Sequence, residues 1–190
     1  LNTEADEALM EKLDPDVILV CSGSEPVVPR ITGIENARYT ADVYFGFEPG
    51  KRVVIIGGGL VGCEAACDYI DHGIETTIVE MQECLMPEVY GLYRTAVHDF
   101  IDKNGGKYEV NAKVVKVGKD FVVAEQDGKE ITLKADSVVN AMGRRAHNAD
   151  ALKAAIEALN VPMWQIGDGV RARQIGDAVR EGWTAAMEII

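Results

Sequence analysis

The sequence predicts an α/β fold in which a parallel β-sheet receives an inserted antiparallel β-meander. A β-branched run, Arg52–Ile56, leads into the glycine-rich turn Gly57–Gly62, and apolar residues then recur at helical spacing. A second run, Glu75–Val79, completes strand, turn, helix and strand in about 30 residues, the length of a βαβ unit. Farther on, three short runs are separated by hairpin turn signals, which is typical of a meander.

The chain before this unit predicts one short strand and a long connector. Residues 1–15 are acidic and weakly helical, and Asp16–Val20 is a continuous apolar run typical of a buried strand. That run enters a tight turn at Cys21-Ser22-Gly23. Residues 24–50 contain prolines and glycines with little periodicity, so we expect an extended connector there.

Two helices follow the glycine-rich turn. The first runs from Leu60 to about His72, and Gly73 is a suitable residue to end it. The second is expected over Pro87–Lys103, and Asn104 with the glycines after it stops that helix.

The meander and the next buried strand come after the second helix. The three meander strands are short and are expected over Lys113–Val117, Phe121–Gln126 and Glu130–Leu133. Ser137–Met142 is another apolar run, and it ends at Gly143. We expect it to be another buried strand.

The last part of the chain predicts helix, strand and helix. Ala149–Leu159 has helical spacing, and Val161–Ile166 is a strand that ends at Gly167-Asp168. A final helix starts at about Ile175 and shows helical spacing through Ala178, Val179, Trp183, Ala186 and Met187. We expect Trp183 to be a packing residue of this helix.

Composition excludes several classes of protein. The 190 residues include 31 acidic and 19 basic side chains, a formal net charge of −12 that would repel a nucleic acid backbone. No apolar run approaches the roughly 20 residues of a membrane span. Hydrophobic residues make up 47% of the chain, enough for a core without disulfide or metal support. We therefore expect neither nucleic acid nor membrane as a partner.

Cysteine usage predicts a reducing environment. The four cysteines form no C-x-x-C pair and the three histidines are scattered, so we expect small buried thiols in the cytoplasm and no metal site. The chain opens Leu1-Asn2-Thr3-Glu4, without the basic region of a signal peptide and without an initiator Met. We expect a piece of a larger cytoplasmic protein.

The glycine-rich turn GGGLVG matches G-x-G-x-x-G through Gly57, Gly59 and Gly62. Gly57 would permit the tight turn, Gly59 would let the backbone approach a pyrophosphate, and Gly62 would let helix and strand pack closely. The first N–H groups of the helix, at the positive end of its dipole, would hold the anion. The sequence therefore predicts a dinucleotide site.

The acidic residue expected of such a site is Glu80. It lies 23 positions after Gly57, close to the usual spacing of about 20, at the end of the second strand. A carboxylate there accepts hydrogen bonds from the adenosine ribose and repels a 2′-phosphate, and neither Met81 nor Gln82 is an arginine that would receive that phosphate. We predict NAD rather than NADP.

Several segments resemble one family. KRVVIIGGGLVGCEAA, TTIVEM and SVVNAMGRR, with the meander between them, resemble the NAD(P)H-binding domain of two-dinucleotide-fold flavoproteins, the pyridine nucleotide-disulfide oxidoreductase superfamily. In that family this domain is inserted into an FAD-binding domain. The flanks DVILVCSGSEPVVPRITGI and WQIGDGVRARQIGDAVREGWTAA resemble the segments that leave and re-enter the FAD domain, with Ser22 in place of the usual Thr.

The resemblance covers about residues 14–190. Within the family, VEM and IGDGVRARQIGDAVREG are most similar to the C-terminal module of 2-enoate reductases and 2,4-dienoyl-CoA reductases. Those NADH:flavin oxidoreductases join a barrel with FMN and an iron–sulfur cluster to this module.

The resemblance implies two groups of cofactor-binding residues. NAD(H) would contact the glycine-rich turn, a Glu beside the nicotinamide and flavin, and two strand ends, which together comprise Gly57, Gly58, Gly59, Leu60, Val61, Gly62, Glu64, Glu80, Met81, Ala141, Met142 and Gly143. FAD would contact two turns and the start of the last helix, through Ser22, Gly23, Gly167, Asp168, Gln174 and Ile175.

The first glycine fingerprint of the family is missing before residue 51. The resemblance thus implies an NAD(H)-binding domain over 50–146, flanked by two tails of an incomplete FAD-binding domain, 1–49 with the crossover and 147–190 on return. The strands DVILV and MWQIG of these tails are expected to be parallel neighbours. We expect no catalytic residue in this fragment, an inactive isolated chain, and FAD, with FMN and an iron–sulfur cluster, in the parent.

The parent enzyme is expected to pass hydride from NADH to FAD and to reduce an enoate or enoyl-CoA type double bond. Two alternatives stay open. One is a disulfide reductase or NADH dehydrogenase of the same superfamily. The other is a non-catalytic ADP-binding module like that of trimethylamine dehydrogenase, which a lack of room for nicotinamide beside Glu64 and Gly143 would favour. The substrate and the oligomeric state are not specified by the sequence.

Overall fold

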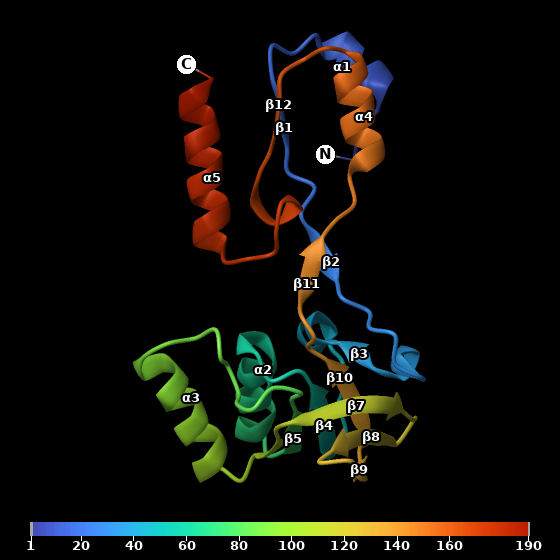
Figure 1. Cartoon of the computed structure of the whole chain (residues 1–190), viewed down its shortest axis with the longest axis vertical. Helices are drawn as coiled ribbons and strands as arrows, with labels where there is room; N and C mark the ends of the chain where they lie inside the picture. Colours follow the sequence, from blue (N-terminus) through green and yellow to red (C-terminus); the bar gives the residue numbers. More distant parts are fainter. Residues whose placement is uncertain (1, 190) are drawn as a thin grey trace. The chain divides into compact units, whose positions relative to one another are not determined.

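The computed structural model describes residues 2–189, apart from the side chains of residues 43–45. Leu1 and Ile190, the outer bounds of the two predicted tails, lie outside the described residues. The chain divides into two compact units (Figure 1): Val27–Gly143 forms one, and Leu1–Pro26 with Arg144–Ile190 forms the other. These bounds differ from those of the predicted domains, whose functional assignment stays a prediction.

A five-stranded sheet lies at the centre of the Val27–Gly143 unit. Its order is β3 (Arg38–Tyr39), β10 (Ser137–Asn140), β4 (Arg52–Ile56), β5 (Glu75–Val79) and β6 (Lys107–Glu109). Every neighbouring pair is parallel, with Ile55 of β4 opposite Ile78 of β5 and Val139 of β10. The predicted parallel sheet is confirmed, and the carboxyl ends of its strands share one edge.

Alternating residues of β4 build a core on each face of this sheet. Val53 and Ile55 pack with α2 (Leu60–Asp71) and α3 (Leu92–Lys103), whereas Val54 and Ile56 pack against the meander. The meander strands are β7 (Ala112–Val117), β8 (Phe121–Gln126) and β9 (Lys129–Lys134), antiparallel throughout. Figure 1 shows the green helices and the yellow meander as separate layers of the unit. The inserted meander is confirmed.

Three features of this unit differ from the sequence-based expectation. The second helix begins at Leu92 rather than Pro87, because Met86 takes a positive φ of 50° and its N–H binds the carbonyl of Gly58 instead of continuing a helix. The expected connector contains β3, which pairs with β10, and two short 3₁₀ helices, Ile34–Asn36 and Thr40–Phe45. The strand β6 was not predicted either.

The two ends of the unit meet. The N–H of Val27 donates to the carbonyl of Gly143 at 3.0 Å, and the amide of Asn140 donates to the carbonyl of Val27 at 2.9 Å. Chain entry and chain exit are therefore held side by side at the carboxyl end of β10.

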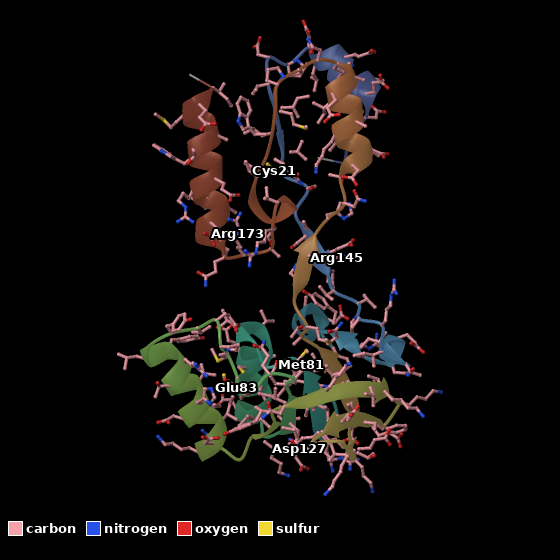
Figure 2. All side chains as sticks on the ribbon, viewed as in Figure 1. Cys21, Met81, Glu83, Asp127, Arg145 and Arg173 are labelled. Carbon is pink, nitrogen blue, oxygen red and sulfur yellow. The ribbon has the colours of Figure 1, made fainter. Side chains whose placement is uncertain are left out.

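The second unit contains two small pairs of strands. β1 (Ile18–Val20) and β12 (Met163–Gln165) are parallel, as predicted for the two tails, with Leu19 opposite Trp164. β2 (Ser24–Pro26) and β11 (Arg144–Ala146) are antiparallel, and Arg145 forms an ion pair with Glu25 at 2.8 Å (Figure 2). The remaining elements are α1 (Glu7–Leu13), α4 (Asp150–Ala158), a 3₁₀ turn at Gly167–Gly169 and α5 (Ile175–Glu188).

The core of the second unit lies under α1 and α4, and α5 contributes little to buried packing. Met10, Val20, Ala149 and Ile156 form this core, whereas Ala185 is the buried residue of α5. Four large apolar side chains of α5 are exposed: Ile175 is 85%, Val179 66%, Trp183 71% and Met187 55% exposed. The expected packing of Trp183 is therefore wrong for the described residues.

Candidate nucleotide-binding site

A cavity of about 550 Å³ lies at the carboxyl ends of β4, β5 and β10, within the Val27–Gly143 unit. In open α/β sheets this edge is where ligands bind. Nine of the predicted NAD(H) residues line the cavity: Gly57, Gly59, Leu60, Val61, Glu80, Met81, Ala141, Met142 and Gly143. The structure thus brings these nine predicted residues together around one cavity.

Three glycines of the turn are required by the protein's own packing. Gly57 has a φ of +105°, and a Cβ there would lie 2.7 Å from the carbonyl oxygen of Ala141. A Cβ on Gly62 would lie 2.0 Å from the carbonyl oxygen of Gly57, and one on Gly58 would lie 2.4 Å from the Leu85 side chain. These residues let β4, α2 and the segment after β5 approach one another.

Gly59 differs from the other three. Its φ of −72° suits any residue, and the atoms near a Cβ built on it belong to the Glu88 side chain, the nearest at 3.1 Å. Backbone packing therefore does not require glycine at this position. The space above Gly59 faces the first turn of α2, where backbone N–H groups and the helix dipole favour an anion. These are the donors that a pyrophosphate would need.

Glu80 is held rigidly at the edge of the cavity. Its side chain is 6% exposed, and its two carboxylate oxygens accept the N–H of Gly58 at 2.7 Å and the N–H of Gln82 at 2.8 Å. Each oxygen can accept one more hydrogen bond. Two backbone donors thus fix the carboxylate while leaving it able to bind ribose hydroxyl groups.

Glu64 lies apart from the cavity lining. It is exposed on α2, and its Oε1 accepts the hydroxyl of Tyr93 at 2.5 Å, which raises the pKa of Tyr93. Gly143 does line the cavity, has a φ of +89° and has open space around a Cβ. The predicted contacts of nicotinamide with Gly143 and with Glu64 both stay predictions.

Sequence reasoning missed three charged residues of the lining: Arg30, Lys113 and Glu88. No ion pair engages Arg30 or Lys113 among the residues the structure describes. Glu88 accepts the N–H of Leu60 at 2.8 Å, at the first residue of α2. No motif marks them, because the segments that hold them were expected to be connector, meander and helix.

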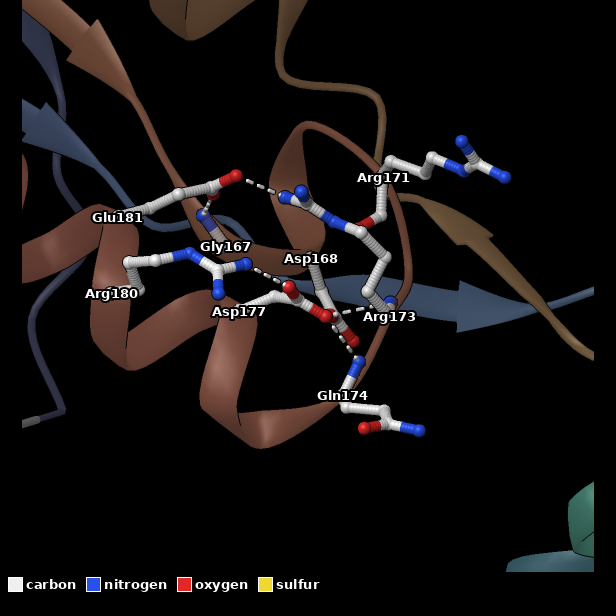
Figure 3. Close-up of polar contacts among 8 residues, drawn as sticks. All are labelled: Gly167, Asp168, Arg171, Arg173, Gln174, Asp177, Arg180 and Glu181. Carbon is white, nitrogen blue, oxygen red and sulfur yellow. Dashed lines mark hydrogen bonds and ion pairs between the residues drawn. The ribbon is translucent and has the colours of Figure 1, made fainter. Parts of the chain in front are cut away.

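The residues predicted for FAD lie in the second unit, around the Gly167–Gly169 turn (Figure 3). Asp168 accepts the Ser24 hydroxyl at 2.9 Å and the N–H of Arg173 at 3.1 Å. Ser22 Oγ is buried without a hydrogen-bond partner among the described residues, next to Gly169. Gln174 begins α5 in a capping box with Asp177, and Ile175 is exposed.

Glu181 closes this polar cluster. It accepts the N–H of Gly167 at 2.7 Å and a guanidinium N–H of Arg173, and these contacts lower the pKa of Glu181 (Figure 3). The turn is thus tied to α5 by charge-assisted hydrogen bonds. The unit offers polar groups for one part of FAD but no second glycine-rich cradle for its pyrophosphate, so the whole cofactor does not fit the described residues.

The described cysteines are all free thiols. Cys63 is buried, and burial raises its pKa to about 12, while burial and then Glu64 raise the pKa of Cys67. Cys21 is exposed (Figure 2). No group of three or more metal-ligating side chains occurs in the described part of the chain, and no described helix is long and apolar enough to cross a membrane.

We expect a thiol reagent such as DTNB to modify Cys21 rapidly at pH 8 and to leave Cys63 unmodified until the chain is unfolded in guanidinium. The thiolate is the reactive form, and burial disfavours it at Cys63. Cys21→Ser should remove the fast phase of the absorbance change. Rapid labelling of Cys63 in the folded chain, identified by peptide mass, would contradict the burial.

The chain is similar to a known family and to several known proteins. A model of the pyridine nucleotide-disulphide oxidoreductase family matches residues 2–171. The chain is 33% identical to an NADH oxidase of Thermoanaerobacter brockii, covering 97% of this chain and 30% of that protein, and 30% identical to a cinnamate reductase of Clostridium sporogenes, covering 100% and 29%.

A solved 2-naphthoyl-CoA reductase complex superposes with a TM-score of 0.84 at 27% identity, covering 96% of this chain and 28% of that one. The chain therefore spans about 30% of the length of these relatives. Since the family model matches most of the chain, the protein belongs to the pyridine nucleotide-disulphide oxidoreductase family, whose members are flavoproteins that use FAD and a nicotinamide nucleotide.

Proposed function

We propose that the Val27–Gly143 unit binds NADH and presents it for hydride transfer to FAD within a larger flavin-dependent oxidoreductase. The observation that supports this most strongly is Gly59. It faces the cavity at the first turn of α2, and a displaceable side chain is its neighbour there. A glycine that the protein's own backbone does not require is best explained by the close approach of a ligand.

Three parts of the lining have a role in this proposal. The first N–H groups of α2 hold the pyrophosphate, Glu80 holds the adenosine ribose, and the open backbone at Gly143 borders the nicotinamide. NADH supplies the hydride, and this chain supplies binding and orientation. Holding the two reactants in the right geometry lowers the activation free energy of such a reaction substantially.

We further propose that the chain is part of a longer polypeptide whose remainder completes the FAD site. The chain spans about 30% of the length of its relatives, and α5 exposes the apolar stripe Ile175, Val179, Trp183 and Met187. Side chains of this kind at helical spacing pack against another element in a complete domain. The missing portion of the FAD-binding domain is the occupant that this stripe fits.

For the substrate, we propose an enoate or enoyl-CoA type double bond, reduced by a parent that also holds FMN and an iron–sulfur cluster. Cinnamate, the compound named for one relative, is itself an enoate, and another relative is a reductase of an aromatic acyl-CoA. In the disulfide reductase alternative, the redox cysteine pair would have to lie outside the described residues, whose cysteines are free.

We expect NADH to bind at least about tenfold more tightly than NADPH. A 2′-phosphate would meet the Glu80 carboxylate, and losing a charge-assisted hydrogen bond costs about 1.5–3 kcal/mol, which is tenfold or more. Fluorescence titration of the 190-residue chain measures both affinities. Lys113→Gln serves as the control, since Lys113 is a cation of the same cavity. If NADPH binds as tightly as NADH or more tightly, and Lys113→Gln removes this binding of NADPH, then Lys113 rather than Glu80 determines which cofactor binds.

We expect the isolated chain to bind NADH but to retain no FAD and to oxidise no NADH. The described residues around Asp168 offer contacts to one stretch of FAD and no pyrophosphate cradle. The test is purification in excess FAD, desalting, an absorbance scan of the flavin bands, and an NADH–ferricyanide assay. A stoichiometric yellow protein, or turnover above that of free flavin, would show that the FAD site is complete.

The second candidate function is a non-catalytic ADP-binding module. The open space beside Gly143 favours NADH, because ADP leaves that end of the cavity unfilled. Titration with ADP separates the two. Equal affinity for ADP and NADH would support the ADP module, whereas tighter binding of NADH would support presentation of the nicotinamide.

A further inference from the structure

One carboxylate of the cavity has no role in the proposed function. Glu88 Oε1 accepts the N–H of Leu60 at 2.8 Å and lies 3.1 Å from where a Cβ of Gly59 would be. The N-cap residue of α2 is Gly59, which has no side chain that could cap this helix end. The position at which a dinucleotide pyrophosphate would bind is therefore held by an anion of the chain itself.

The segment that presents Glu88 is firmly anchored. Leu85 and Met86 are fully buried, and the N–H of Met86 donates to the carbonyl of Gly58 at 2.7 Å. The N–H of Val89 donates to the carbonyl of Met86 at 3.0 Å, which closes a tight turn around Glu88. The backbone of Glu88 thus stays close to the glycine-rich turn whether or not its side chain contacts α2.

The Glu88 side chain, in contrast, is free to leave. It is exposed, and its contact with Leu60 is its one hydrogen bond to the described residues. Rotation about its side-chain torsions removes the carboxylate from the cradle without moving the anchored backbone. A pyrophosphate and the carboxylate cannot share the first turn of α2, because both are anions that need the same donors.

We propose that Glu88 is an internal competitor for the nucleotide, a displaceable carboxylate that occupies the pyrophosphate cradle of the empty site. It lowers the affinity for every ligand with a pyrophosphate, since the competent state is only the fraction in which Glu88 has moved away. It also returns to the N–H of Leu60 when the nucleotide departs. Glu88 thereby lowers the affinity for the nicotinamide nucleotide, an inference that rests on the proposed binding of NADH.

Removing the negative charge of Glu88 should increase the affinity for the nucleotide, although most changes to a cavity residue weaken binding. Glu88→Gln keeps an oxygen acceptor for the Leu60 N–H but removes the negative charge. We expect NADH and ADP to bind about 3- to 30-fold more tightly to this variant, the range set by charge effects at a helix N-terminus. Because Glu88 competes only for the empty site, the apparent association rate constant of NADH should rise by a similar factor, and its dissociation rate should change little.

The matched control is Glu83→Gln. Glu83 is an exposed carboxylate of the same segment that does not line the cavity (Figure 2), so this variant makes the same change in net charge. We expect its affinities to stay within about twofold of the parent chain. Melting without nucleotide provides a second readout, since Glu88→Gln should slightly lower the stability of the empty chain while it raises affinity.

Calorimetric titration of the whole chain and both variants with NADH and with ADP decides the matter. Tighter binding by Glu88→Gln alone supports the competitor. Unchanged binding, equal gains in both glutamine variants, or weaker binding by Glu88→Gln would overturn it, the last by making Glu88 a ligand contact. If the parent chain binds neither NADH nor ADP, the proposed function itself fails, and the two failures are thus distinguishable.

Discussion

Gly62→Ala should destabilise the Val27–Gly143 unit by about 3 kcal/mol or more. The new methyl group would lie 2.0 Å from the carbonyl oxygen of Gly57 and 3.2 Å from the Cβ of Ala141. The first of these is a backbone atom, so α2 must move away from the turn, and overpacking of this kind is among the most destabilising changes in a core. Urea denaturation followed by circular dichroism measures the loss.

The matched control for Gly62→Ala is Gly176→Ala. Gly176 is also helical, in α5, and a Cβ there meets nothing within 4 Å. Alanine should therefore stabilise it by about 0.5–1 kcal/mol through helix propensity. Both tryptophans, Trp164 and Trp183, lie in the other unit, so tryptophan fluorescence should follow the Gly62→Ala transition less than circular dichroism does. Equal stability of the two variants would contradict the close approach at Gly62.

Gly59→Val should abolish NADH binding while leaving the fold intact. The φ of Gly59 suits valine, and the Glu88 side chain is the neighbour that must give way. The branched side chain would then fill the space that the pyrophosphate needs, and we expect affinity to fall about 100-fold or more. Titration with NADH and a melting curve test the two halves of this prediction.

Gly59→Ala should show an intermediate loss, because its single methyl group leaves part of the space open. A Gly59→Val chain that melts normally and binds NADH as tightly as the parent would show that the turn serves packing alone. A chain that fails to fold would contradict the structure at Gly59, where no backbone atom opposes a Cβ.

The sequence was sufficient where local pattern and tertiary packing agree. β4 and β5 occupy the predicted ranges because β-branched runs buried on both faces have few other structures open to them. The glycine-rich turn was identifiable because each glycine answers a separate steric demand. The parallel pair β1 and β12 was expected only through the family resemblance, since nothing in either run specifies its partner.

The remaining features depend on contacts between distant segments. β3 has only two residues and forms by pairing with β10. A segment of this length has no sequence periodicity that could predict it. Glu88 was hidden in a segment with helical composition, and its carboxylate matters because Met86 is bound to Gly58. The stripe on α5 was correctly identified as apolar, but pattern alone could not reveal that its partner is absent from the described residues.

The hydrogen bond between Val27 and Gly143 has a consequence for how such proteins are assembled. A unit whose first and last residues are in contact can be inserted into a surface loop of a host domain without separating the two ends of that loop. It can also be removed, and the ends of the loop can then be joined by a short linker. Residues 27–143 are a compact unit of this insertable kind. A unit with adjoining ends can therefore be inserted or removed while the host domain keeps its own fold.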